Sequence, residues 1–536
     1  MNKFITLILC LCCVFTSAWA EGDDHTSLNP SDANIVGHIL DKKTGEHLSF
    51  INVYLHGTTI GTTTDATGHY YMKNLPEGKY TLVMKSIGYK TEEKTVTLKK
   101  GKTLEINFNA EEDAVSLDGV VVSANRNETT RRLAPSLVNV LDSKVFETTH
   151  ATSLADGLNF QPGVRVENNC QNCGFQQVRI NGLEGPYTQI LVDSRPIFSA
   201  LTGVYGLEQI PANMMERVEV MRGGGSALFG SSAIAGTINI ITKEPMRNSA
   251  QIAHSLTMIG GSRPDNNTTV NASLVTDDHR AGLYIFGQNR YRSGYDYDGD
   301  GFTELPKLKN QTVGFRSYLK TSTYSKLTFE YHHMQEFRRG GDMLNRPPHE
   351  AHIAEQLQHS IDGGSLKFDY FSPDEKNRLS VFASAANTDR DSYYGPGNDP
   401  LKAYGKTTDL TAMGGAQYVH TFDKCFFMPS DLTAGLEYNR DRLKDNMWGY
   451  NRHTDQTVNI YSAFLQNEWK NDRWGILIGG RLDKHNMVDN VIFSPRANLR
   501  FNPTQNINLR LSYSSGFRAP QAFDEDMHIE NVGGTV

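Results

Sequence analysis

Two linked runs decide the fold: residues 222–230 (RGGGSALFG) and residues 233–243 (AIAGTINIITK). Residues 218–220 (VEV) before the glycines and residues 238–240 (INI) after them alternate apolar and polar side chains, which predicts a strand on each side. The glycines between them permit left-handed backbone in the connecting loop. A phosphate-binding loop would end in a GK[ST] motif, which is missing here. The stretch therefore predicts a strand, a glycine-rich loop and a second strand without a nucleotide site.

Composition narrows the class of protein. The chain has 536 residues, of which 38% are hydrophobic and 21% charged, and its formal net charge is -7. This charge offers no basic surface, so nucleic acid is not an expected partner. The mean hydropathy is -0.46, and no run of 18 or more apolar residues follows residue 20, which argues against membrane-spanning helices. A transmembrane β-barrel remains open, because its strands alternate lipid-facing and lumen-facing residues.

Residues 1–20 predict a signal peptide. Lys3 precedes an apolar stretch from Phe4 to Phe15, and residues 17–20 (SAWA) have the small-x-small pattern that signal peptidase cleaves. Twelve residues at about 1.5 Å each cannot cross a hydrocarbon core about 30 Å thick, so a membrane anchor is the weaker interpretation. We expect cleavage after Ala20 and an exported, acidic mature chain.

Three cysteines remain after this cleavage. Cys170 and Cys173 are two residues apart, a spacing shared by redox pairs, zinc half-sites and local disulfides. No second CxxC or HxxxH occurs nearby, and an exported protein favours a disulfide that fixes a loop. A redox or metal role is the alternative. Cys425 is expected to be unpaired.

Short alternating segments separated by turns predict a small antiparallel β-sandwich over residues 33–112. Residues 36–39 (VGHI), 64–70 (TDATGHY) and 75–80 (LPEGKY) resemble the carboxypeptidase regulatory-like domain at the front of many Bacteroidetes outer-membrane receptors. The segment lacks an HxxE zinc pair, so we expect a spacer or docking module and not a peptidase.

A short β-branched run follows the sandwich at residues 117–124. Its members are Leu117, Asp118, Gly119, Val120, Val121, Val122, Ser123 and Ala124. An extended strand with open hydrogen-bonding groups can pair with the edge of a partner's sheet. The run resembles the TonB box of TonB-dependent receptors, which implies that it binds TonB. The alternative is a last strand of the sandwich.

Residues 127–245 match the plug domain of TonB-dependent receptors in the order and spacing of their motifs. Residues 154–158 (LADGL) predict a short helix, because Leu154 and Leu158 are four residues apart. The motif residues on which the resemblance depends are Arg179, Asn181, Gly182, Asp193, Arg222, Gly223, Gly225, Gly230 and Gly236. The resemblance implies an α+β plug inside a barrel.

Residues 246–536 carry the two-residue periodicity of β-strands with one apolar and one polar face. Residues 507–514 (INLRLSYS) are an example. About thirteen strands can be placed, whereas receptors of this family close their barrel with twenty-two. We expect a mainly β chain that is C-terminally truncated, with an incomplete antiparallel transmembrane barrel.

Two loops contain candidate metal ligands. Asp296, Asp298, Asp300 and Glu304 begin like the calcium loop of an EF-hand. Lys307 stands at its twelfth position and flanking helices are not apparent, so we expect a calcium-ordered loop or a solvated acidic turn. His349 and His352 are weaker candidates for a metal or an iron porphyrin, because Ile353 stands where a zinc HExxH motif needs histidine.

The resemblance implies an outer-membrane importer of a scarce metal chelate: a ferric siderophore, heme or cobalamin. Expected partners are TonB with its inner-membrane energising complex, outer-membrane lipid, the barrel assembly machinery and the small chelate, and a surface lipoprotein is a further candidate. No cofactor is required, and no nucleophile with a base and an orienting group indicates an enzyme. The alternatives are a passive or adhesive barrel that displays loops, and a glycan importer.

Overall fold

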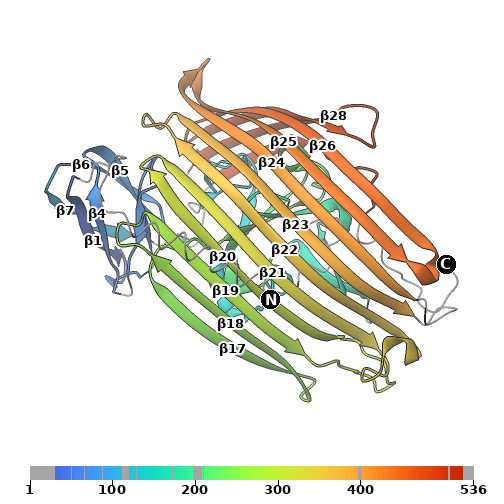
Figure 1. The fold of residues 1–536 in the computed structure, drawn as a ribbon. Helices are drawn as coiled ribbons and strands as arrows, with labels where there is room; N and C mark the ends of the chain where they lie inside the picture. The colour runs from blue at the N-terminus through green and yellow to red at the C-terminus, as the bar shows by residue number, and fades with distance from the viewer. Residues whose placement is uncertain are drawn as a thin grey trace.

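A computed structural model gives the fold in three consecutive parts, which are a small sandwich, a plug and a large sheet (Figure 1). It describes residues 31–49, 51–65, 67–86, 89–111, 120–127, 129–170, 174–196, 208, 210–395, 401, 403–504 and 507–522. The predicted signal peptide therefore lies outside the described residues. The mainly β fold that the sequence predicts is confirmed.

Two small sheets form the sandwich. One has the order β4-β1-β7 with β8 also on β1, and the other has the order β3-β2-β5-β6. The strands are β1 Ala33–Asp41, β2 Asn52–Leu55, β3 Gly61–Thr63, β4 His69–Leu75, β5 Gly78–Lys85, β6 Glu92–Leu98, β7 Thr103–Glu105 and β8 Phe108–Ala110. Every second residue of β1 is buried, so Ile35 and Ile39 pack in the core with Val53 and Phe108. The prediction of an antiparallel sandwich is wrong for β7 and β8, which pair with β1 in parallel, whereas the other strand pairs are antiparallel.

The plug contains a four-stranded sheet of order β11-β15-β16-β14. Its elements, with the short strands before it, are β9 Val120–Val121, β10 Thr129–Thr130, β11 Val138–Asp142, α2 Ser143–Thr148, α3 Leu154–Leu158, β12 Val164–Cys170, β13 Phe175–Ile180, η1 Gly185–Tyr187, β14 Thr188–Val192, η2 Ala212–Met214, β15 Met215–Arg222, α5 Ser226–Phe229 and β16 Gly236–Thr242. The predicted strands on either side of the glycine-rich loop are β15 and β16, and the structure shows that they pair antiparallel.

The predicted short helix of the plug is α3. Ser153 and Asp156 form a capping box at its first turn, which satisfies backbone N–H groups that the helix leaves open. Leu154 and Leu158 are buried in the same core as Val218 and Ile238 of the sheet. Among the residues that the structure describes, no helix has the length and apolar character needed to span a bilayer.

The large sheet has thirteen strands, each antiparallel to its neighbours in sequence. They are β17 Ser249–Ile259, β18 Arg263–Val275, β19 Ala281–Arg292, β20 Lys307–Ser322, β21 Ser325–Gly341, β22 Ala354–Phe371, β23 Asn377–Gly395, β24 Tyr404–Cys425, β25 Met428–Met447, β26 Arg452–Lys470, β27 Trp474–His485, β28 Ile492–Thr504 and β29 Ile507–Ser514. Two loops contain the short helices η3 Pro348–Glu350 and η5 Trp448–Tyr450. The number of strands agrees with the prediction, and β17 and β29 form the edges of the described sheet.

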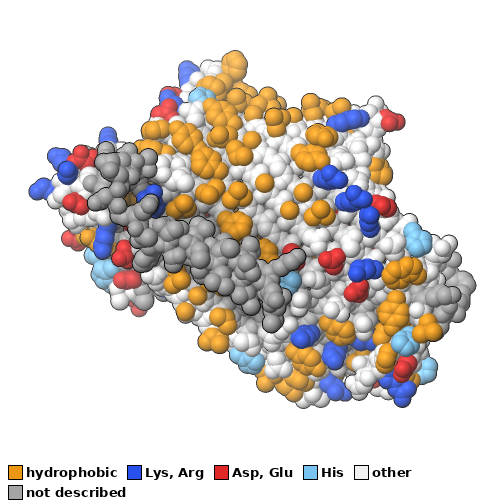
Figure 2. Space-filling model, in the orientation of Figure 1, with side chains coloured by type: hydrophobic (Ala, Val, Ile, Leu, Met, Phe, Trp, Pro, Cys, Tyr) orange, Lys and Arg blue, Asp and Glu red, His pale blue; other side chains and the backbone are white. Residues whose placement is uncertain are grey.

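The large sheet has an apolar outer face and a charged inner face. On β19, Ile285 and Tyr291 are 41% and 40% exposed, whereas Arg290 and Arg292 are only 6% and 7% exposed. Figure 2 shows apolar side chains spread over the strands that face the viewer. In water the arginines would be outside and the apolar side chains inside. The reversed arrangement is typical of a barrel wall embedded in lipid.

The connections differ between the two ends of the large sheet. Residues 276–280, 323–324 and 372–376 form short turns at one end. Residues 293–306 and 342–353 form long loops at the other end. Barrels of this type have short turns toward the periplasm and longer loops outside the cell. The long-loop end is therefore the extracellular one.

The sandwich contacts the short-turn end. The Thr59 N–H donates to the Thr323 carbonyl at 2.9 Å, and His56 Nδ1 lies 2.7 Å from Glu375 Oε2. In Figure 1 the blue strands of the sandwich lie beside this end of the green barrel strands. The contacts place the sandwich on the periplasmic side.

Candidate functional site

Buried ion pairs fasten the plug to the inner face of the barrel. Glu208 of the plug lies 3.1 Å from Arg292 of β19 and 2.7 Å from Arg338 of β21. All three side chains are buried. Burial alone would raise the pKa of Glu208, but Arg338, Arg292 and Arg290 hold it at about 2. The charge of Glu208 is thus maintained at the contact.

A second cluster surrounds Arg316 of β20. Its Nη1 lies 2.5 Å from Asp193 Oδ2 and also contacts Thr242 and Glu330. Asp193 Oδ2 also accepts a hydrogen bond from the Thr242 hydroxyl at 2.7 Å. Arg316 therefore joins the end of β14 and the end of β16 to the barrel wall.

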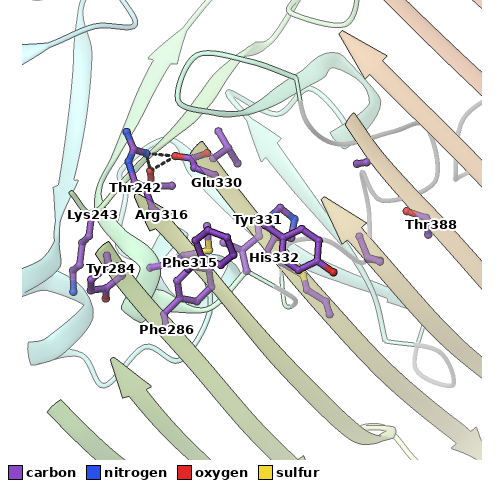
Figure 3. A pocket seen from close by; sticks show the side chains of 16 residues that line it. Thr242, Lys243, Tyr284, Phe286, Phe315, Arg316, Glu330, Tyr331, His332 and Thr388 are labelled. Atoms are coloured by element: carbon purple, nitrogen blue, oxygen red, sulfur yellow. Dashed lines mark hydrogen bonds and ion pairs between the residues drawn. The ribbon is translucent and has the colours of Figure 1, made fainter. Parts of the chain in front are cut away.

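The same cluster borders a cleft between plug and wall. Its volume is about 730 Å³, part of which is open to solvent. Figure 3 shows Arg316, Thr242 and Glu330 together at one side of it. The other labelled lining residues are Lys243, Tyr284, Phe286, Phe315, Tyr331, His332 and Thr388. The cleft combines aromatic walls with one charged corner.

A third cluster follows the predicted TonB box. Arg126 Nη2 lies 2.5 Å from Glu437 Oε1 of β25, and Arg481 of β27 lies 2.7 Å from the other oxygen of Glu437. Arg126 Nη1 donates to the Leu228 carbonyl of α5 at 3.0 Å. The backbone of Arg126 has φ of 63°, a region that few residues other than glycine occupy. Arg126 therefore connects the start of the plug with α5 and β25, and Glu437 extends this contact to β27.

Glu219 of β15 holds the segment just before Arg126. Its Oε2 accepts hydrogen bonds from the Val122 and Ser123 N–H groups, both at 2.9 Å, and from the Ser123 hydroxyl at 2.7 Å. Its Oε1 accepts from Arg217 at 2.9 Å. Asn239, opposite Glu219 on β16, donates to the Ser123 hydroxyl at 3.0 Å. Glu219, Ser123 and Asn239 are fully buried, so this contact lies inside the plug.

The described residues include only part of the predicted TonB box. Residues 117–119 lie outside them. β9 pairs antiparallel with β10, and Val121, Ser123 and Ala124 are buried. The expectation of an open, isolated strand is therefore wrong for the second half of the run, since that half is paired and fastened to the plug.

The glycines of the plug motif serve two purposes. Gly223 and Gly230 have φ of 87° and 83°, the left-handed backbone that glycine permits. Gly225 has φ of -114° and does not use this freedom. A Cβ at Gly225 would lie 2.7 Å from Thr237 Oγ1, and a Cβ at Gly236 would lie 2.5 Å from the Met221 carbonyl oxygen. Close packing requires glycine at these two positions.

The remaining motif residues shape turns and strand pairs. Asn181 and Gly182 have φ of 52° and 84° and form the tight turn after β13. Arg179 of β13 contacts Glu167 on the partner strand β12. Arg222 is exposed at the end of β15. These residues build the plug and do not converge on one site.

The cysteines are found on two different strands. Cys170 ends β12, and its thiol lies 3.2 Å from Glu355 Oε2 of β22. Cys173 lies outside the described residues, so its disulfide with Cys170 stays a prediction. Cys425, at the end of β24, is a free cysteine as expected.

Four carboxylates meet in the long loop between β19 and β20. One ligand oxygen each from Asp296, Asp298, Asp300 and Glu304 lies within 4.8 Å of the others. It is the only group of three or more such side chains that meets this criterion in the described part of the chain. The loop is flanked by strands and not by the helices of an EF-hand, as expected. Its acidic side chains are arranged closely enough to share one cation.

His349 and His352 have separate partners. His349 Nδ1 lies 2.7 Å from the Tyr404 hydroxyl, and His352 Nδ1 lies 2.6 Å from Asp342 Oδ2. Neither belongs to a three-ligand group within the described ranges. Their contact with a metal or porphyrin stays a prediction.

The sequence predictions omit the charges that fasten the plug. Alternation in residues 218–220 predicts that Glu219 faces away from a core, yet it is fully buried. The sequence did contain one indication of this contact. Glu219 and Asn239 are the central polar residues of the two strands that the glycine-rich loop connects, and they face each other across the pair. Arg126 carries no local signal, since its partner Glu437 is 311 residues away in sequence.

Family models match three segments of the chain. A CarboxypepD_reg-like domain matches residues 35–122, a TonB-dependent receptor plug domain matches residues 130–237, and a TonB-dependent receptor-like β-barrel matches residues 247–535. The barrel model alone covers more than half of the chain. The order of the three is the one that the sequence resemblance implies.

Curated relatives include a vitamin B12 transporter, BtuB, of Vibrio vulnificus, which is 24% identical over 424 residues. That alignment covers 76% of this chain and 64% of the relative. An iron-regulated outer membrane virulence protein of Vibrio cholerae is 26% identical over 443 residues, which cover 78% of this chain and 63% of the relative. The chain thus spans less than two thirds of the length of these relatives.

Solved structures share the fold. The siderophore receptor PirA from Acinetobacter baumannii has a TM-score of 0.62 at 20% identity, over 72% of this chain and 62% of that chain. A ferric enterobactin receptor mutant, PfeA, from Pseudomonas aeruginosa in complex with enterobactin has a TM-score of 0.60 at 18% identity, over 73% and 63%. The chain belongs to the TonB-dependent receptors of the outer membrane, with a carboxypeptidase regulatory-like domain ahead of its plug and barrel.

Proposed function

We propose that this receptor binds a scarce metal chelate, which is a ferric siderophore, heme or cobalamin, and imports it into the periplasm with energy from TonB. The names of the relatives support this choice, since they include a vitamin B12 transporter and siderophore receptors. In this proposal no bond of the ligand changes, and the protein is a transporter and not an enzyme.

The ligand would bind at the extracellular end, where the long loops are. Chelates of this size exceed what diffuses through general pores, which is why a closed and selective route is needed. In the described structure, the plug is attached to the inner wall through Glu208, Asp193 and Arg126. Transport therefore requires that some of these contacts break.

The chain order suggests how force from TonB would reach the plug. TonB would pair with the strand that begins at residue 117, by addition of a β-strand. Tension would next act on Val122 and Ser123, which Glu219 holds, and then on Arg126. Leaving one charge of a buried ion pair without its partner costs about 3–5 kcal/mol, so Arg126 and Glu437 would separate only if both charges reach water or new partners. The attachment of residues 122 and 123 to Glu219 is the observation that carries the proposed coupling of TonB to the plug.

Ligand binding tests the proposed substrate class. The purified receptor would be titrated calorimetrically with ferric siderophores, heme and cobalamin, and with an oligosaccharide as a matched control. We expect saturable binding of one chelate and no heat from the oligosaccharide. Binding of the oligosaccharide alone would support a glycan importer, and binding of none would support a passive or adhesive barrel.

We also propose that calcium orders the extracellular acidic loop. Calcium prefers carboxylate oxygens, and Asp296, Asp298, Asp300 and Glu304 supply four of them close together. The Gly299 N–H donates to Asp296 at 2.7 Å and the Phe302 N–H to Asp300 at 2.8 Å, which turns the loop around its acids. Neutralising this charge would favour one conformation of the loop at the ligand entrance.

A further inference from the structure

Three histidines from separate segments meet on the outer surface of the sandwich. His38 on β1 and His69 on β4 are direct partners across the antiparallel pair. His47 follows β1 and lies next to both rings. The ring centroids are 5.3 Å apart for His38 and His47, 5.7 Å for His38 and His69, and 4.8 Å for His47 and His69. His38 is half-buried and the other two are exposed, so a solute can reach the cluster.

This spacing is close to that of imidazoles that share one tetrahedral cation. A nitrogen ligand lies about 2.0–2.1 Å from zinc, which puts the centroids of two imidazole ligands about 5 Å apart. In the structure the rings are stacked and tilted, and their nitrogens do not all lie within 4.8 Å of one another. Binding therefore requires rotation of rings in the cluster, chiefly that of His47, which is exposed. Exposed side chains change rotamer within nanoseconds, so this ring can turn toward the other two.

Hydrogen bonds beside His69 prepare one of its ring nitrogens. Thr67 Oγ1 lies 2.6 Å from Asp65 Oδ1 and 3.0 Å from His69 Nδ1. An ionised carboxylate only accepts, so the Thr67 hydroxyl donates to Asp65 and accepts from the Nδ1–H of His69. The lone pair of neutral His69 is then on Nε2, where a metal can bind. Metal-ligating histidines usually have their other ring nitrogen hydrogen-bonded in this way.

Gly68 allows the third histidine to approach. Its φ is +79°, and a Cβ at this position would lie 2.7 Å from the Cβ of His47. The Ile39 N–H donates to the Gly68 carbonyl at 3.0 Å, and the Leu48 N–H donates to the Ile39 carbonyl at 2.8 Å. The backbone of β1 therefore fixes both the turn before His69 and the segment that carries His47.

We propose that His38, His47 and His69 form a binding site for a divalent transition cation of the zinc type, with water in the remaining position. Imidazole nitrogen suits zinc, copper and nickel, whereas calcium and magnesium take oxygen ligands. The site lies on the periplasmic sandwich, far from the acidic loop at the other end of the barrel. It is independent of which chelate the receptor imports.

Zinc titration of the whole, untagged receptor tests the site. Excess calcium in the buffer would occupy the acidic loop, and calorimetry would measure zinc binding. We expect one zinc per chain and at least a tenfold loss of affinity in each of His38→Gln, His47→Gln and His69→Gln. The control His150→Asn changes an exposed histidine of the plug, whose φ of 53° asparagine tolerates. It should leave the affinity unchanged.

A second variant separates ligation from folding. Thr67→Ala removes the hydroxyl that supports His69 Nδ1 and donates to Asp65, while the backbone N–H groups of residues 67 and 69 still donate to Asp65. We expect zinc affinity roughly tenfold to a hundredfold lower, the usual effect of such a loss. Its thermal unfolding without metal should match that of the unmodified protein. Cobalt bound in place of zinc should show the strong visible absorption of a tetrahedral complex. The proposal would be overturned if the three histidine variants bound zinc as tightly as the unmodified receptor. It would also be overturned if His150→Asn lost as much affinity as they do.

Discussion

Replacement of Glu219 by alanine should release the segment that follows the TonB box. In the unmodified protein one carboxylate oxygen of Glu219 accepts three hydrogen bonds, from the Val122 N–H, the Ser123 N–H and the Ser123 hydroxyl. Alanine leaves the part-buried N–H of Val122 and the buried N–H of Ser123 without this acceptor. The hydrogen bond from Asn239 to Ser123 would remain.

The size of the effect follows from these contacts. A hydrogen bond to a charged group contributes about 1.5–3 kcal/mol, and three bonds that share one oxygen do not add fully. We therefore expect the state in which residues 122–123 are attached to β15 to lose about 3–5 kcal/mol relative to the state in which they are detached. At about 1.4 kcal/mol per tenfold, release becomes on the order of a hundred to several thousand times more frequent. Glu219→Gln keeps the shape but loses the charge, and we expect roughly a tenfold change.

Amide hydrogen exchange measures this release directly. Mass spectrometry of peptides that contain residues 120–127 would report the opening of the segment in the purified receptor. The matched control is Glu216→Ala, since Glu216 lies on the same strand, is 41% exposed and pairs with Arg217 at 3.0 Å. Exchange should accelerate strongly in Glu219→Ala and stay unchanged in Glu216→Ala. Unchanged exchange in Glu219→Ala would refute the reasoning.

Three further predictions concern other contacts. Arg316→Ala leaves Asp193 and Glu330 without their shared partner, so the end of β14 should exchange faster, whereas exposed Arg263→Ala should have no effect. Glu208→Gln should lower the thermal midpoint at pH 7. The pKa of Glu208 is lowered from 4.5 to about 2, so the stabilisation by its charge is present above pH 4.5 and is lost as the pH falls toward 2. The thermal midpoints of Glu208→Gln and of the unmodified protein should therefore converge near pH 2. Asp298→Asn should weaken calcium binding roughly tenfold in a calcium titration, because it removes one charged ligand; Asp277→Asn should not.

Repeating patterns made most of the fold predictable. The alternation of residues 507–514 is typical of a strand with one lipid-facing side, and β29 covers these residues with Leu511 71% exposed. Leu154 and Leu158, four residues apart, predict α3, because the spacing of apolar residues reflects the face that an element buries. The parallel pairing of β7 and β8 with β1 has no such local pattern, because it depends on how distant segments pack.

The polar contacts of the site were much less predictable. The partners of Arg126 and Glu208 lie on barrel strands, at positions that no spacing in the sequence connects with the plug. His38 and His69 become neighbours only through the register of β1 and β4. The acidic loop is the exception, because its four ligands lie within nine consecutive residues and their alternation already indicates a cation.

Uptake of labelled chelate by cells tests the central claim most directly. A receptor that lacks residues 118–121 would lose the strand offered to TonB but keep Val122 and Ser123 on Glu219. Uptake and surface binding would be compared with those of the unmodified receptor, using the chelate that calorimetry identifies. The account predicts that energised uptake falls to background while binding is retained. Undiminished uptake by the deleted receptor would contradict a TonB-dependent importer.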